Sequence, residues 1–176
     1  MSGPETLTDL VTGLAVPDVG AERRRQDVER FLLEKKGWDR AEIRVDFPVN
    51  FELPGMGAFH SAVDLALFLE GAPFLAVKVA AGSIDSWERM ALAAARIMAA
   101  VPAPLAAVCD GRQALILDAA TGRRFGRGME MIPHRDEAPA LLAGRAPSEP
   151  LPPERIKLER IIFRSYDADL VNRARK

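Results

Sequence analysis

The chain has 176 residues, of which 48% are hydrophobic and 28% are charged, so it can bury a full core and is not disordered throughout. Its 24 basic and 25 acidic residues give a formal net charge of -1, which excludes a globally basic surface for nucleic acid. One cysteine and two histidines exclude an internal disulfide and provide too few soft ligands for a zinc cluster.

The first twenty residues form an N-terminal arm that contains several turn signals. Gly13, Pro17 and Gly20 separate short apolar pieces, which is compatible with either a lead-in hairpin or an irregular segment. The opening MSGPETLTDL lacks the charged and apolar regions of an export signal, and no apolar stretch approaches ~18 residues. We therefore expect a cytoplasmic protein that does not enter a membrane.

The next sixty residues read as one helix and three strands. Residues 21–36 place apolar side chains on one helical face, and Gly37 follows at the position typical of a helix end. Hydrophobic residues then alternate with polar ones in residues 41–53 and 59–71, and residues 74–82 form an apolar run. Short turns between these segments predict an antiparallel meander.

The following segment changes to a helical pattern and then returns to strands. Residues 83–101 are rich in alanine, methionine and leucine and predict a helix of roughly four turns, which Pro102 and Pro104 terminate. Residues 105–111 read as a buried strand, and residues 113–122 as another strand followed by a turn. A strand, a helix and a strand in this order suggest a right-handed crossover that covers one face of the sheet.

The C-terminal part is less regular. Residues 136–142 suggest a short helix, residues 144–153 form a proline-rich connector, and Pro153 can open a helix that reaches Arg164. The remaining residues read as a polar tail with a basic end. We thus expect one α/β domain over residues 21–143, flanked by the arm (1–20) and by the connector, helix and tail (144–176).

A lysine interrupts the apolar strand PFLAVKVAAG at residues 73–82. An unpaired ammonium in a core strand costs several kcal/mol, so Lys78 requires a partner. Asp64 lies inside the preceding strand, and residues of antiparallel neighbours can face each other on one sheet surface. The sequence therefore predicts a pair between Lys78 and Asp64.

The segments VDLALFLEGAPFLAVKVA and GRQALILDAATG, in this order of elements, resemble the N-terminal nuclease domain of type I restriction enzyme R subunits, a branch of the PD-(D/E)xK superfamily. The resemblance extends from Glu22 to Gly122. It implies a restriction-endonuclease-like core: a mixed sheet with an antiparallel meander, a crossover helix and flanking helices. It also implies a site in which two carboxylates hold Mg²⁺ at the scissile phosphate and a lysine stabilises the developing charge.

The residues at the matching positions depart from the family pattern. Asp64 matches the family aspartate, but Lys78 stands at the glutamate position and Ala80 at the lysine position. A cation at a ligand position repels Mg²⁺, and an alanine cannot stabilise an anion. We therefore expect a degenerate site that holds no metal, with Asp64 as the ligand of Mg²⁺ should the protein be active.

Some members of the superfamily move an acidic ligand to a neighbouring helix. Glu88, with Asp85 beside it, could supply the carboxylate from the helix after the third strand, and Glu22 or Glu29 from the first helix. For all of these residues a solvated polar helix face is the more common role.

Arg123, Arg124 and Arg127 form a basic cluster that could contact phosphates, although interleaved acidic residues favour an ordinary solvated surface. The leading interpretation is a catalytically degenerate module of a restriction or DNA-processing system, associated with nucleic acid or with protein subunits. Two alternatives stay open: an active Mg²⁺-dependent endonuclease with a relocated ligand, and an oligomerising scaffold that binds no nucleic acid.

Overall fold

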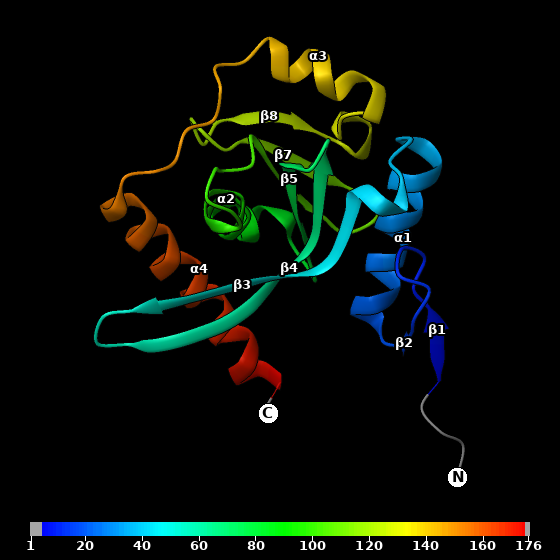
Figure 1. Ribbon diagram of the computed structural model, residues 1–176. Helices are drawn as coiled ribbons and strands as arrows, with labels where there is room; N and C mark the ends of the chain where they lie inside the picture. Colours follow the sequence, from blue (N-terminus) through cyan, green and yellow to red (C-terminus); the bar gives the residue numbers. More distant parts are fainter. Residues whose placement is uncertain (1–4, 175–176) are drawn as a thin grey trace.

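The computed structural model describes residues 5–174, with side chains up to residue 166. Its centre is a six-stranded mixed sheet in the order β3-β4-β5-β6-β7-β8, and helices lie on both faces (Figure 1). The strands of this sheet are β3 (Ile43–Leu53), β4 (Gly57–Leu69), β5 (Ala72–Val79), β6 (Leu105–Cys109), β7 (Ala114–Asp118) and β8 (Arg124–Arg127). The α-helices are α1 (Gly20–Lys35), α2 (Glu88–Ile97), α3 (Ala138–Ala143) and α4 (Pro153–Ala174).

The meander and the crossover that the sequence predicts are both present in the sheet. β3, β4 and β5 pair antiparallel as a meander, and β5 then pairs with β6 in parallel, with α2 in the connection between them. β6 and β7 pair antiparallel. The mixed α/β architecture, with one parallel crossover between two antiparallel parts, is consistent with a restriction-endonuclease-like core.

The two faces of the sheet carry separate hydrophobic cores. One core packs α2 and Phe163 of α4 against the sheet, and the other packs Val28 and Leu32 of α1 with Ala138 of α3. Four alanines of α2 are at least 96% buried: Ala91, Ala93, Ala94 and Ala95. Small side chains let this helix approach the strands closely, so the alanine-rich segment packs on the sheet, as its composition favours.

The turn between β4 and β5 determines which residues of these strands face each other. Glu70 and Gly71 both have positive φ, 52° and 83°, as a two-residue type I′ hairpin turn requires. A register shift follows at Leu67/Phe68, so that Leu65 pairs with Val77. Continuing this register by one residue places Asp64 opposite Lys78 on the same sheet surface.

The β3–β4 hairpin changes direction at Asp46, whose φ of 48° is rare for a residue with a side chain. Before this point Ile43 belongs to the core under α1, whereas Val49 and Phe51 belong to the core under α4. The outer half of the hairpin therefore extends beyond the other strands and lies against α4 (Figure 1). The bend leaves polar side chains at the junction of the two cores.

The N-terminal arm is a hairpin, which resolves the two alternatives that the sequence left open. β1 (Thr6–Thr8) pairs antiparallel with β2 (Ala15–Pro17) in a sheet of their own. Among the described residues, no helix combines the length and the hydropathy that crossing a bilayer requires.

Three segments differ from the sequence predictions by more than a small shift of their ends. The helix predicted over residues 83–101 is a 3-10 turn at Ile84–Trp87 followed by α2, which ends at Ile97, four residues short of the predicted end. The predicted polar tail is part of α4, which continues to Ala174 because neither glycine nor proline interrupts residues 154–174. The last two residues of the basic end lie outside the described residues.

The third difference concerns the segment after β7, where the sequence predicted only a basic cluster. Residues 124–127 form β8, which pairs antiparallel with β7 at the edge of the sheet. Arginine and glycine residues carry no alternating apolar pattern, so periodicity gives no sign of this strand. It forms because β7 offers an unpaired edge.

Candidate functional site

Lys78 and Asp64 form the ion pair that the sequence predicts. The Lys78 Nζ lies 2.9 Å from Asp64 Oδ2, and the side chains are 14% and 26% exposed. The backbone N–H of Val79 donates to the same oxygen at 2.7 Å. Lys78 Nζ also lies 5.1 Å from the centre of the Trp87 ring, a cation–π contact from the turn before α2. The cation in the apolar strand is thus compensated by a carboxylate and an aromatic face.

One carboxylate oxygen of Asp64 is occupied by two donors in this arrangement. A hard cation requires its oxygen ligands at ~2.0 to 2.6 Å, whereas Asp64 Oδ2 already accepts from an ammonium and a backbone N–H. Ala80, two residues after Lys78, is 1% exposed and belongs to the core under α2. Among residues 5–166, no group of three or more His, Cys, Asp or Glu side chains is arranged to hold a metal ion.

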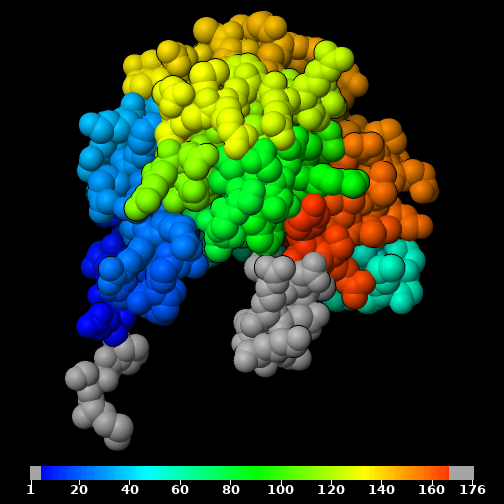
Figure 2. Space-filling model, turned by 180° about the vertical axis from the view of Figure 1, so that it is seen from behind, coloured from blue at the N-terminus to red at the C-terminus, as the bar shows by residue number. Residues whose placement is uncertain are grey.

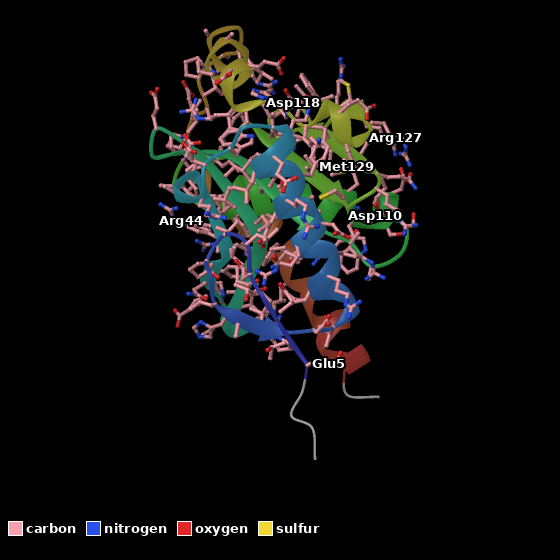
Figure 3. All side chains as sticks on the ribbon, turned by 90° about the vertical axis from the view of Figure 1, so that its right-hand side faces the viewer. Glu5, Arg44, Asp110, Asp118, Arg127 and Met129 are labelled. Atoms are coloured by element: carbon pink, nitrogen blue, oxygen red, sulfur yellow. The ribbon has the colours of Figure 1, made fainter. Side chains whose placement is uncertain are left out.

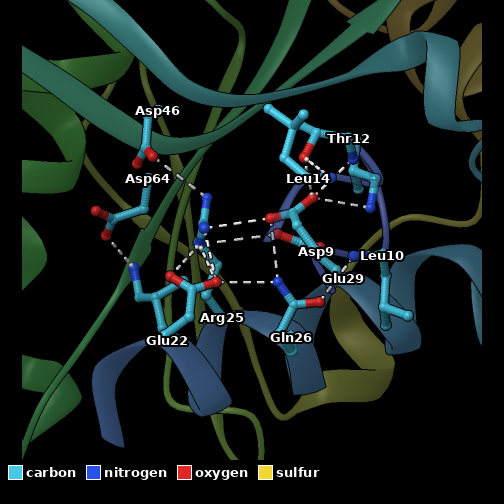
Figure 4. A network of polar contacts seen from close by, with 12 residues as sticks. Asp9, Leu10, Thr12, Leu14, Glu22, Arg25, Gln26, Glu29, Asp46 and Asp64 are labelled. Atoms are coloured by element: carbon cyan, nitrogen blue, oxygen red, sulfur yellow. Dashed lines mark hydrogen bonds and ion pairs between the residues drawn. The ribbon is translucent and has the colours of Figure 1, made fainter. Parts of the chain in front are cut away.

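A second cation, Arg25 on α1, lies at the centre of a carboxylate network (Figure 4). Its guanidinium is 8% exposed and lies 2.6 Å from Glu22, 3.2 Å from Asp9, 3.4 Å from Asp46 and 3.8 Å from Glu29. A buried guanidinium of this kind is stable only when carboxylates surround it, because an isolated buried charge costs several kcal/mol.

Asp9 connects the N-terminal hairpin to this network and is 1% exposed. Its Oδ1 accepts from the N–H groups of Val11 and Thr12 at 3.0 and 2.7 Å, and from the Thr12 hydroxyl at 2.9 Å. Its Oδ2 accepts from Gln26 Nε2 at 3.1 Å. Burial acts to raise the pKa of Asp9, but the Thr12 donors and Arg25 outweigh it and lower the pKa below its ordinary value.

Glu29 is the least satisfied member of the network. Its side chain is fully buried, and both of its carboxylate oxygens lack a hydrogen-bond partner. Burial, with the repulsion of Asp9, raises the pKa of Glu29 to about 7 against the opposing effect of Arg25. Around neutral pH this carboxyl group is therefore about half protonated.

The carboxylates outnumber the cations at this site. Asp9, Glu22, Glu29 and Asp46 surround Arg25, and the Asp64–Lys78 pair lies beside them, so that the site holds five carboxylates and two cations. Partial loss of water raises the pKa of Asp46, and the nearby Asp64 carboxylate adds to this shift while Arg25 opposes it. Even with Glu29 protonated, the network carries a net negative charge.

The site lies between α1 and α4. Arg25 reaches it from α1, and Trp87, which contacts Lys78, packs against Tyr166 of α4 with 5.9 Å between ring centres. Viewed from behind, residues of the β5–α2 region (green) lie at the surface between α1 (blue) and the described part of α4 (orange to red) (Figure 2).

The other candidate residues have partners of their own. Glu88 Oε2 accepts from Arg124 at 3.1 Å, and Asp85 pairs with Arg124 at 3.1 Å and with Arg127 at 2.9 Å. The hydrogen bond from Arg127 is the main cause that lowers the pKa of Asp85. Arg123 is exposed in the turn between β7 and β8. Two of the three arginines in the basic cluster are thus neutralised by residues that precede or open α2.

Sequence reasoning missed Arg25, Asp9 and Asp46 as members of the site. The alternating pattern of β3 contains Asp46, and counting through the PGMG turn would have placed it opposite Asp64. An aspartate followed three residues later by a threonine also signals the local turn at Asp9. No local pattern shows that this turn docks on α1, since its partner Gln26 is 17 residues away.

Comparison with known proteins gives one family. A family model described as the type I restriction enzyme R protein N terminus matches residues 20–133, which include α1, the whole six-stranded sheet and the Asp64–Lys78 pair. Neither the curated proteins nor the solved structures contain a significant match.

Proposed function

Since the chain belongs to the family of type I restriction enzyme R protein N termini, we propose that it is a non-hydrolytic module of a restriction or DNA-processing system. One observation carries this proposal: the Lys78 ammonium lies 2.9 Å from the carboxylate of Asp64, the residue at the family's aspartate position. The pair joins β4 and β5 where active relatives would bind Mg²⁺. We therefore expect a structural role for these two side chains in place of a catalytic one.

The charges favour a protein partner over nucleic acid at this site. In a metal-dependent nuclease the divalent ion offsets the repulsion between carboxylates and the DNA phosphates. Here the negative charge of five carboxylates at the site is offset by the two cations that pair with them, Arg25 and Lys78. A phosphate backbone would be repelled from such a surface. Another subunit of the same system, with a basic contact surface, is the partner that this charge suits.

Calorimetric titration of the full chain with Mn²⁺ and Mg²⁺ tests the proposal. We expect no binding in the millimolar range and no cleavage of plasmid or single-stranded DNA with either ion, because the Asp64 oxygen is already bonded to Lys78 and Val79. Metal binding or cleavage that disappears in Asp64→Asn would contradict the proposal and establish an active enzyme. Cleavage that persists in Asp64→Asn would indicate a contaminating nuclease, to be removed before the test is read.

Binding of a short DNA duplex, measured by fluorescence anisotropy at low and moderate salt, distinguishes a module that binds nucleic acid from one that binds a protein partner. We expect weak binding that falls steeply with salt and does not change in Asp64→Asn. Tight binding at moderate salt that depends on residues of the network would contradict the preference for a protein partner. Sedimentation at two protein concentrations tests the remaining alternative of a self-associating scaffold.

Restoring the family pattern should restore affinity for metal. In Lys78→Glu with Ala80→Lys, a second carboxylate replaces the ammonium beside Asp64, so we expect Mn²⁺ to bind at least about tenfold more tightly than to the unaltered chain. Lys78→Gln is the matched control, because it removes the cation without adding a ligand. Circular dichroism checks that both variants fold, since Ala80 is buried. A folded double variant with no gain over the control would contradict the assigned positions.

A further inference from the structure

A second site lies at the other end of the sheet, in a cavity of about 400 Å³. This volume is in the range of small-molecule pockets. The proline-rich connector between α3 and α4 folds back over the β6–β7 end of the sheet and forms one side of the cavity. The lining combines apolar side chains, among them Pro104, Ala119 and Leu151, with three arginines and Glu149.

Three arginines from separate parts of the chain converge on this cavity. Arg96 comes from α2, Arg145 follows α3, and Arg155 belongs to the first turn of α4. Among the described residues that line the cavity, Glu149 is the one carboxylate, and it is exposed. Within the lining itself arginines outnumber carboxylates, and two further carboxylates, Asp118 and Glu159, lie against the arginines from outside it.

Two carboxylates outside the lining hold the arginines in place. Glu159 is 1% exposed, and its Oε1 lies 2.8 Å from Arg96 and 2.7 Å from Arg155. Asp118, at the end of β7, pairs with Arg145. Each guanidinium is thus oriented before any ligand arrives, which reduces the entropy lost on binding.

The arginines keep donors for a ligand. A guanidinium has five N–H donors, and Arg96 gives two bonds, from Nε to the Ala119 carbonyl at 2.8 Å and from Nη1 to Glu159. Arg145 bonds through Nη2 to Asp118 and to the Pro104 carbonyl. Among the described side chains, the fully buried polar atoms without a partner are confined to Glu29. The unbonded nitrogens of Arg96 and Arg145 are therefore accessible to solvent or to a ligand.

We propose that this cavity binds a small organic phosphate through Arg96, Arg145 and Arg155. A phosphate monoester carries up to two negative charges and three terminal oxygens, which match three guanidinium groups better than a carboxylate with one charge does. The proline, alanine and leucine side chains of the lining provide an apolar wall for the organic part of the ligand. The ligand would join the connector and α4 to the sheet.

The cavity is separate from the Asp64–Lys78 site. Asp118 pairs with Leu105, and Leu105 pairs with Leu75 near the start of β5, whereas Lys78 lies near the end of that strand. Figure 3 places Asp118 near α3, at the opposite end of the molecule from Glu5 of the N-terminal hairpin. The phosphate site therefore does not depend on the proposed loss of hydrolysis.

Calorimetric titration of the full chain with AMP and with adenosine tests the proposal at about 0.15 M salt, where attraction to exposed charges is screened. We expect AMP to bind with a dissociation constant below about 1 mM, inorganic phosphate to compete with it, and adenosine not to bind. Failure of both AMP and inorganic phosphate to bind at millimolar concentration would overturn the proposal. Equal binding of adenosine would overturn it as well, because the phosphate would then contribute nothing.

Substitutions of single arginines test whether AMP binds in this cavity. Arg155→Gln should weaken AMP binding at least about tenfold while the fold persists, because this side chain is 45% exposed and Arg96 still pairs with Glu159. Arg145→Gln should have a similar effect. Arg112→Gln, which removes an exposed arginine at the other end of β7, is the matched control and should bind AMP unchanged. AMP binding that survives both cavity variants, or that is lost equally in the control, would refute the assigned site.

Discussion

Replacing Asp9 with alanine is expected to lower the free energy of unfolding by about 3 kcal/mol, because it removes a buried charge with several partners. The Val11 and Thr12 donors lose their acceptor. On α1, Gln26 and Arg25 lose the Asp9 carboxylate as a partner. Urea unfolding followed by circular dichroism measures the change. Hydrogen exchange of the β1–β2 amides should show the largest local loss of protection.

Asp9→Asn is the control for this experiment, because its carbonyl oxygen can still accept from the N–H groups of Val11 and Thr12. We expect the asparagine variant to lose roughly half as much stability as the alanine variant. An alanine variant that stays within about 0.5 kcal/mol of the unaltered chain would show that the hairpin does not depend on the network.

Replacing Glu29 with glutamine is expected to change how stability depends on pH. The pKa of Glu29 is about 7 in the folded chain and 4.5 as its ordinary value, so the folded state binds one more proton between these limits. The free energy of unfolding should therefore fall as pH rises from 4.5 to about 7, and stay constant above that. Over this window the glutamine variant should gain about 3 kcal/mol relative to the unaltered chain.

The groups that face Glu29 do not reverse this expectation. Burial and the charge of Asp9 act in the same direction, and the opposing effect of Arg25 is already contained in the value. The pKa of Asp9 lies below its ordinary value, so Asp9 changes stability only at more acidic pH. Urea unfolding at about pH 5 and about pH 8 measures the difference.

Glu34→Gln is the matched control, since it removes an exposed glutamate from the same helix. Its stability relative to the unaltered chain should be the same at both pH values. An identical pH dependence for Glu29→Gln and for the unaltered chain would mean that Glu29 is not the group that titrates. If Glu29→Gln instead lost stability relative to the unaltered chain on going to the higher pH, the expected sign would be contradicted.

Local patterns predicted much of the fold. Alternation in β3 and β4, the apolar runs of β5 and β6, and the helical periodicity of α1 predicted these elements in the correct order and pairing. The ion pair between Lys78 and Asp64 was predicted by the cost of burying an unpaired ammonium. These features depend on neighbours in the chain or on adjacent strands, where spacing in the sequence is close to spacing in the structure.

Other features carry no local pattern. β8 forms on the free edge of β7 and has no alternating hydrophobic residues of its own. The acidic network unites the N-terminal hairpin, α1 and the bend of β3, and the arginine cavity unites α2, the connector and α4. In each case charged residues that look like ordinary surface positions become partly buried only when distant elements pack together.

The sequence by itself determined that this chain folds as an α/β domain of the family and that Lys78, a cation inside an apolar strand, needs an acidic partner, because both follow from residue identities along the strands. The tertiary structure decided the partners of the remaining charges. The register shift at Leu67/Phe68 aligned Asp64 with Lys78, and packing of α1 brought Arg25 to the carboxylates. Long-range packing determines which charges lose water together, and no spacing in the sequence encodes that directly.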